Sequence, residues 1–426
     1  MEEKIDLLIR NASELLTLKG ENKARTQWEM NELGIIKGGS VAVCDGKIHA
    51  VATDEEIEWI VEVSTDTKVI DAKGKTVMPG FVDPHTHLIF SGSREDELHM
   101  KLEGKSYLEI LSIGGGILRT VRDTRFAGED KLFETAQKVL DRMLNFGTTT
   151  VEAKSGYGLE TETEIRSLEV IKRLNEEHTM DLVATFLGAH AIPHEYEGNP
   201  DGYVNLVVGD MIPKVGEKKL AEFCDVFCEQ DVFSVEQSKR VLLAGKEYGM
   251  TPKIHADEIV RLGGTELACE VGAISASHLM ESSEIGIMEM ALKGVIGVLV
   301  PGTPFALMQK EYPRARYMID SGVPVALATD FNPNCWTESM QFMIALACYN
   351  MGMLPSEAIV ASTINAAHAI NRADEVGSIE VGKKADIIIL DAPNHLHIPY
   401  RFGGNLVETV VKGGEVVVER AESSER

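Results

Sequence analysis

The stretch that decides the fold reads Phe81-Val82-Asp83-Pro84-His85-Thr86-His87. It begins as a short apolar strand and ends in two histidines that are two residues apart, so both imidazoles lie on the same side of the strand. Imidazole nitrogen is a ligand for borderline ions such as zinc and iron. A buried strand with this ending predicts a metal site at its carboxyl end.

Seven further strand-like runs follow, and helical segments separate them. We expect the eight strands at residues 81–87, 148–153, 182–189, 225–228, 253–255, 274–277, 295–300 and 325–329. The clearest helices are expected over residues 129–145, 162–177 and 235–248, where apolar residues recur at spacings of three and four. Eight strands that alternate with helices over about 250 residues predict an α/β fold, a metal-dependent (β/α)8 TIM barrel.

The two ends of the chain differ from this middle part. Residues 4–76 contain short β-rich runs with a hairpin signature at Asp45-Gly46, and the C-terminal part repeats the pattern around Gly413-Gly414. Neither end has enough strands for independent stability. We therefore expect a small β-sandwich domain built from both termini, residues 1–76 and 381–426, beside a barrel of residues 77–380.

The charge balance restricts the possible partners. The chain has 42 Lys and Arg against 67 Asp and Glu, a net charge of -25. Such a surface repels phosphate backbones and anionic lipid, so we expect neither a nucleic-acid nor a membrane partner. The six cysteines, and an N-terminus unlike a secretion signal, indicate a cytoplasmic protein with reduced thiols. An anionic small-molecule substrate would require a dedicated cationic residue.

Polar residues gather where barrel enzymes carry their chemistry, at the carboxyl ends of the strands. Of the 12 histidines, five follow or close expected strands, and a carboxylate follows the eighth strand: His85, His87, His190, His255, His278 and Asp330. A single histidine in this position is more often a hydrogen-bonded core residue. Four such side chains, all at the carboxyl ends of expected strands, favour a metal site. We assign the metal to His85, His87, His255 and Asp330. A bound ion lowers the pKa of water towards roughly 7, which makes hydrolysis the expected reaction class.

Taken together, residues 81–87, the shared terminal β domain and residues 376–386 resemble the amidohydrolase superfamily over nearly the whole chain. Residues 87–94, 112–117, 152–159, 186–190 and 329–334 resemble, more narrowly, the imidazolonepropionase family of histidine degradation. The resemblance implies hydrolytic ring opening of 4-imidazolone-5-propanoate to N-formimidoyl-L-glutamate. It also implies one divalent or trivalent ion per subunit, zinc or iron, and a homodimer.

The same resemblance extends to individual residues. It implies substrate contacts from Arg94, Tyr107, Tyr157, His190, Glu258, Asn332, Asn334 and Cys335. Arg94 is expected to clamp the propionate, and Tyr107 fits a core aromatic equally well. Many family members carry Gly-Ser or Gly-Thr where this chain has Asn334-Cys335, so a hydroxyl contact at 335 would be weakened while a backbone N–H contact would persist.

The expected acid–base set consists of Glu258, His278 and Asp330. Asp330 is expected to take the first proton from water. His278 would orient the nucleophile or polarise the carbonyl, and Glu258 would hold a ring N–H. Glu258 follows His255 by three residues, so the two share a face if the chain is helical there.

Two other functions are compatible with the pattern. A metal-dependent aminohydrolase of a cyclic amidine such as guanine uses the same ligands, and Arg94 and Tyr157 distinguish it from the ring-opening enzyme. A non-catalytic scaffold similar to dihydropyrimidinase-related proteins would have lost ligands, whereas this chain has the complete set.

Two further features bear on the expected site. In binuclear relatives a bridging lysine comes from the fourth strand, but Lys154 ends the second. We therefore expect one metal, with Lys154 as a charge partner at the barrel mouth. Gly114-Gly115-Gly116 predicts a mobile loop over that mouth, because glycine permits unusual backbone angles.

Overall fold

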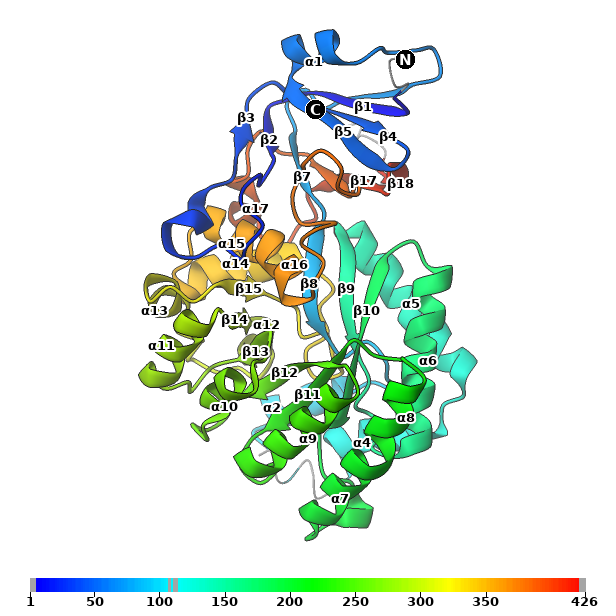
Figure 1. Ribbon diagram of the computed structural model, residues 1–426, viewed down its shortest axis with the longest axis vertical. Helices are drawn as coiled ribbons and strands as arrows, with labels where there is room; N and C mark the ends of the chain where they lie inside the picture. The colour runs from blue at the N-terminus through cyan, green and yellow to red at the C-terminus, as the bar shows by residue number, and fades with distance from the viewer. Residues whose placement is uncertain (1–4, 106–108, 110–113, 421–426) are drawn as a thin grey trace.

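A parallel sheet of eight strands forms the centre of the molecule (Figure 1). The computed structural model describes residues 5–105, 109 and 114–420 of the chain. The strands are β8 (Phe81–Thr86), β9 (Thr148–Lys154), β10 (Asp181–Ala189), β11 (Phe223–Cys228), β12 (Thr251–Ala256), β13 (Ser275–His278), β14 (Ile296–Leu299) and β15 (Val325–Leu327). They pair in sequence order, and each strand lies at one of the expected positions.

Backbone hydrogen bonds close this sheet into a barrel. The amide of His87 donates to the carbonyl of Phe331 at 2.8 Å, and the amide of Asp330 donates to the carbonyl of His85 at 3.1 Å. These bonds join the first strand to the segment that follows the last. The predicted (β/α)8 barrel is confirmed, and its closure places the residues after β8 and β15 next to one another.

Helices follow the strands and cover the outside of the barrel (Figure 1). The long helices α5 (Glu129–Asn145), α6 (Thr161–Glu177) and α9 (Val235–Glu247) lie where apolar residues recur at spacings of three and four, as predicted. The shorter ones are α2 (Glu95–Leu102), α4 (Ile117–Phe126), α7 (Pro200–Leu206), α8 (Ile212–Glu217), α10 (Gly264–Val271), α11 (Glu284–Lys293), α12 (Gly302–Ala306), α13 (Ala315–Asp320), α14 (Met340–Met351), α15 (Pro355–Ala361) and α16 (Ile364–Ala369), with the single turns η2 (His194–Tyr196) and η3 (Val207–Met211). None of the described helices combines the length and apolarity that a membrane span requires.

Two smaller sheets are built from the chain ends. One has the order β5 (Lys47–Thr53), β4 (Gly39–Cys44), β1 (Leu7–Ala12) and β6 (Lys68–Asp71). The other has the order β18 (Glu415–Glu419), β17 (Val407–Lys412), β16 (Ile387–Leu390), β7 (Thr76–Pro79), β2 (Glu14–Leu16) and β3 (Ile35–Ile36). Only the second sheet combines both termini. The helix α1 (Asp54–Ile60) packs on β4 and β5, whereas η1 (Gln27–Asn31) contacts α15 and α17 (His397–Tyr400) contacts α14.

The two terminal sheets share one apolar core. Leu7, Ile9 and Val41 from the first sheet belong to the same cluster as Ile387 and Val411 from the second. Both predicted hairpin turns are present. At the first turn Asp45 and Gly46 have φ of 48° and 75°, and at the second Gly413 and Gly414 have φ of 54° and 84°. Positive φ at both central residues is the geometry of the two-residue turns that match the twist of paired strands.

Candidate active site

Three histidines and one aspartate meet at the carboxyl end of the barrel. Nε2 of His85 and Nε2 of His87 lie 3.4 Å and 3.3 Å from Oδ1 of Asp330. Nε2 of His255 lies 3.2 Å from Nε2 of His87. All four side chains are buried. The structure thus brings together, from strands far apart in the sequence, the four residues that we assigned to a metal.

The atoms at this centre fit a metal ion. His85 Nε2, His278 Nε2 and Asp330 Oδ1 are buried and have no hydrogen-bond partner among the described residues. Buried polar atoms are normally hydrogen bonded, so unused nitrogen and oxygen lone pairs that face one another call for another partner. Imidazole and carboxylate donors suit zinc and iron. The donor set therefore matches the predicted ion.

Partners on the far side of the rings hold two of the imidazoles in place. Oγ of Ser277 lies 2.8 Å from Nδ1 of His85, and Oδ1 of Asp225 lies 3.1 Å from Nδ1 of His255. A carboxylate only accepts hydrogen bonds, so Nδ1 of His255 carries the proton and Nε2 keeps its lone pair towards the centre. Ser277 and Asp225 are functional residues that the sequence reasoning missed.

Asp225 belongs to a group of charged residues inside the barrel. Nζ of Lys154 lies 2.6 Å from Oε1 of Glu152 and 2.9 Å from Oδ2 of Asp225. Nζ of Lys253 lies 3.5 Å from Oε1 of Glu152 and donates to the carbonyl of Pro84 at 3.0 Å. The four charged side chains are fully buried. Lys154 is a charge partner, as expected, but its partners lie within the barrel beneath the metal centre.

Charge and burial oppose each other at Asp225. Burial raises the pKa of this carboxyl, but the neighbouring His255 imidazole and Lys154 ammonium outweigh that effect and hold the pKa well below its ordinary value. Asp225 is therefore ionised at neutral pH and available as an acceptor for the imidazole.

Asp330, His278 and Glu258 lie on the side of the centre that faces the mouth. Oδ2 of Asp330 accepts from the hydroxyl of Thr303 at 2.5 Å, and Nδ1 of His278 lies 3.6 Å from Oε2 of Glu258. The chain bends after His255, with a φ of 48° at Asp257, instead of continuing as a helix. Glu258 therefore reaches His278 through a bend, and Thr303 is a further residue that the sequence reasoning missed.

Glu258 and Asp330 have different acid–base properties. Burial, reinforced by the negative charge of Asp330, raises the pKa of Glu258 to about 7. Burial also raises the pKa of Asp330, but the imidazoles of His85 and His87 beside its Oδ1 outweigh that effect and hold the pKa well below its ordinary value. The arrangement provides one permanently ionised carboxylate and one carboxyl that titrates near neutrality.

Tyr157 and His190 form an aromatic wall beside the metal centre. The ring of His190 stacks on that of His87 with a centroid distance of 4.7 Å, and the ring of Tyr157 lies 5.2 Å from that of His190. Nδ1 of His190 donates to the carbonyl of Gly156 at 2.9 Å. Burial lowers the pKa of His190 well below its ordinary value, so the ring is neutral and its Nε2 is an acceptor.

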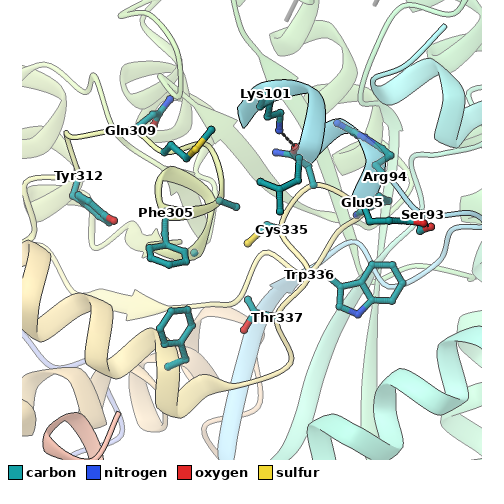
Figure 2. Close-up of a pocket in the computed structure, with 17 residues that line it drawn as sticks. Ser93, Arg94, Glu95, Lys101, Phe305, Gln309, Tyr312, Cys335, Trp336 and Thr337 are labelled. Atoms are coloured by element: carbon teal, nitrogen blue, oxygen red, sulfur yellow. Dashed lines mark hydrogen bonds between the residues drawn. The ribbon is translucent and has the colours of Figure 1, made fainter. Parts of the chain in front are cut away.

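Arg94 lies at the start of α2 with its side chain only 9% exposed. Its Nε donates to Oε2 of Glu97 at 3.0 Å, and Oε1 of Glu97 accepts from the amide of Gly116 at 2.7 Å. Arg94 is thus not a solvated surface arginine. It lines a cavity of about 840 Å³ together with Lys101 and Trp336 (Figure 2). Tyr107 lies outside the described residues.

The loop after β15 is organised by Asn332. The side-chain oxygen of Asn332 accepts from the amides of Asn334 at 2.8 Å and Cys335 at 3.1 Å, and its amide nitrogen donates to the carbonyl of Asp330 at 2.7 Å. The two backbone N–H groups that we expected to meet a ligand are therefore engaged within the loop. The side chains of Asn334 and Cys335 both line the cavity.

Comparison with known proteins places the chain among hydrolases of this architecture. Residues 238–417 and 68–110 match two models that are each described as an amidohydrolase family. The imidazolonepropionase of Geobacillus sp. (strain WCH70) is 55% identical over 416 residues, which cover 97% of this chain and 98% of the relative. The imidazolonepropionase of Alkaliphilus metalliredigens (strain QYMF) is 53% identical over 417 residues, or 98% of this chain and 99% of the relative.

Solved structures resemble the fold at lower identity. The guanine deaminase of E. coli superposes with a TM-score of 0.75 at 15% identity, over 99% of this chain and all of the other. An adenosine deaminase from Xanthomonas campestris with bound zinc superposes with a TM-score of 0.72 at 18% identity, over 99% of this chain and 94% of the other. These similarities show the fold alone.

Proposed function

This chain belongs to the imidazolonepropionase family of amidohydrolases, and we propose that it opens the ring of 4-imidazolone-5-propanoate to give N-formimidoyl-L-glutamate. It is a hydrolase of a non-peptide C–N bond in a cyclic amide, and its substrate is a small molecule. The observation that carries this function is the 49% to 55% identity, over nearly the full length, to relatives that bear this name. The deaminases share only the fold, so deamination is not favoured.

The family is metal-dependent, and we propose that His85, His87, His255 and Asp330 hold one zinc or iron ion. When bound, the ion supplies a Lewis acid that makes water nucleophilic at neutral pH. Asp225 and Ser277 orient two of the imidazoles towards it.

The reaction breaks the bond between the ring carbonyl carbon and the adjacent ring nitrogen. The oxygen of water adds to the carbonyl carbon, which becomes the new carboxylate of the product, and the nitrogen leaves with a proton. Asp330 accepts the proton released by the attacking water and passes it to the leaving nitrogen. His278 polarises the ring carbonyl, and Glu258 holds a ring N–H from the same side of the mouth.

The remaining residues bind the substrate. The two Nη groups of Arg94 meet the propionate, since Nε is already engaged with Glu97. Nε2 of the neutral His190 accepts a ring N–H, and Tyr157 packs against the ring.

The loop after β15 completes the proposed site. Asn332 holds its shape, and Asn334 and Cys335 border the pocket. Cys335 has no hydroxyl, and its thiol points to the carbonyl of Thr329 at 3.6 Å.

Three further properties are proposed for the whole chain. The composite β domain comprises residues 1–76 and 381–426, and its first boundary falls at the start of β7, a strand of the terminal sheet. The enzyme acts as a homodimer, as the family resemblance implies. A cytoplasmic location agrees with the six free cysteines.

The test separates ring opening from deamination. The purified enzyme is incubated with imidazolone propionate and, in a second reaction, with guanine, while ring absorbance and ammonia are followed. Loss of ring absorbance with the first compound, without ammonia, is the expected result. Ammonia release from guanine with no ring opening of imidazolone propionate would overturn the proposal.

A further inference from the structure

One face of α2 carries three charged residues, of which the two cations line a neighbouring cavity. Arg94, Glu97 and Lys101 follow each other at spacings of three and four, which places them on the same side of a helix. Arg94 and Lys101 both line the cavity of about 840 Å³. Figure 2 shows both on this helix, with Lys101 directed towards the loop that carries Cys335.

The two cations on this face have different partners. Glu97 is buried and lies 3.0 Å from Nε of Arg94, so it neutralises the guanidinium locally. Nζ of Lys101 donates to the side-chain oxygen of Asn334 at 2.7 Å, a neutral partner. Within the part of the chain that the structure describes, no carboxylate lies at ion-pair distance from Lys101. Glu95 also lines the cavity, but its side chain is exposed and does not pair with Lys101.

The environment of Lys101 makes this charge costly. Burial lowers its pKa, and the nearby charge of Arg94 lowers it further. A partly buried ammonium without a counter-ion is unfavourable unless an anion joins it. On a chain with a net charge of -25, a lysine that lines a cavity without an ion-pair partner among the described residues is a feature that a bound anion would explain.

We propose that Lys101 binds the propionate of the substrate together with Arg94, and that Asn334 holds the ammonium in place until the carboxylate arrives. The inference rests on the proposed function, because it takes the substrate to be the anionic imidazolone. Arg94 binds the carboxylate through its Nη groups, and Lys101 adds a second cation from the same helix. The bound carboxylate gives Lys101 the ion-pair partner that it lacks.

The experiment measures kcat and KM of Lys101→Met, Lys101→Arg and wild type with imidazolone propionate and with its uncharged propionamide analogue. Lys101→Met should raise KM for the propionate about tenfold, which corresponds to the loss of one charge-assisted hydrogen bond. Its kcat and metal content should be nearly unchanged. Lys101→Arg should restore most of the affinity, and KM for the propionamide should not respond. Arg122→Gln, which removes an exposed cation paired with Asp123, is the charge-matched control and should behave as wild type.

A second variant does not depend on the loss of the lysine. Asn334→Asp places a carboxylate at 2.7 Å from Nζ, where it competes with the substrate. It should raise KM for the propionate while thermal stability stays equal or increases. If Lys101 had only a structural role, Asn334→Asp would leave KM unchanged while thermal stability stayed equal or increased. That result would overturn the inference.

Two other outcomes would also overturn the inference. An equal loss for propionate and propionamide in Lys101→Met would overturn the carboxylate role. A wild-type enzyme that leaves imidazolone propionate intact would overturn the proposed function, and this inference with it.

Discussion

Replacement of Asp225 by asparagine should weaken metal binding without removing a ligand. Oδ1 of Asp225 accepts from Nδ1 of His255 at 3.1 Å, and Oδ2 accepts from the ammonium of Lys154 at 2.9 Å. Asparagine has one oxygen and two N–H donors. If its oxygen faces His255, its NH₂ group meets the donors of Lys154. If its oxygen faces Lys154, its NH₂ group meets Nδ1 of His255, and the ring proton moves to Nε2, the atom that should ligate.

Both orientations have a predictable cost. Loss of the partner that orients a ligand imidazole weakens metal affinity about 10- to 100-fold, which is roughly 1.4 to 2.7 kcal/mol. Lys154 keeps its contact with Glu152 at 2.6 Å, so the buried network is disturbed but not abolished. The assay is competition between the reconstituted enzyme and a chromophoric chelator, with urea unfolding of the metal-free protein as a separate measure of stability.

Two controls isolate the orienting effect. Asp141→Asn changes an exposed carboxylate that lies 3.3 Å from Nε2 of His178, and metal affinity should not respond. Glu152→Gln removes a negative charge from the same buried network but does not contact His255. If Asp225→Asn binds metal as tightly as Glu152→Gln does, the effect is one of charge and the orienting role is refuted.

The remaining expectations concern the substrate site, the metal and one buried acid. Arg94→Ala should raise KM for the propionate at constant metal content, whereas Asp330→Ala should lose turnover and metal together; the reverse pattern in kinetics and metal analysis would contradict both roles. Chelator treatment should abolish activity, and zinc or iron should restore it. Burial raises the pKa of Glu164 above its ordinary value, so the folded state binds this proton more tightly and stability is lost as pH rises through that pKa. Glu164→Gln should therefore raise Tm at pH 8 more than at pH 5, and equal changes in thermal scans at both pH values would argue against this.

The positions of the candidate ligands could be predicted because the barrel strands lie side by side in the order in which they occur in the sequence. Strands buried on both faces read as continuous apolar runs, so their carboxyl ends are visible in the sequence. His85, His255 and Asp330 each lie at such an end, and the parallel arrangement brings all these ends to one side. Their convergence follows from the topology alone.

The residues that orient the ligands could not be predicted in the same way. Lys154 on β9 contacts Asp225 on β11, although β10 lies between these strands in the sheet. That contact crosses the barrel interior and depends on register and side-chain length, which the apolar pattern does not encode. Glu152 and Lys253 are charged residues within apolar strand runs, and this interruption was the available signal. The sequence places Glu97 three residues after Arg94, but it does not show that the Glu97 side chain is buried.

The buried network also explains why one ion is expected. A lysine that bridges two metals must first lose its proton so that its amine can be carboxylated. Burial lowers the pKa of Lys154, but the charges of Asp225 and Glu152 outweigh this and raise it, so the side chain stays an ammonium held by two carboxylates. The fourth barrel strand, β11 (Phe223–Cys228), contributes Asp225 and has no lysine. Two ammonium groups and two carboxylates thus form a neutral layer beneath the histidines, and a second cation would find no free anionic ligand there.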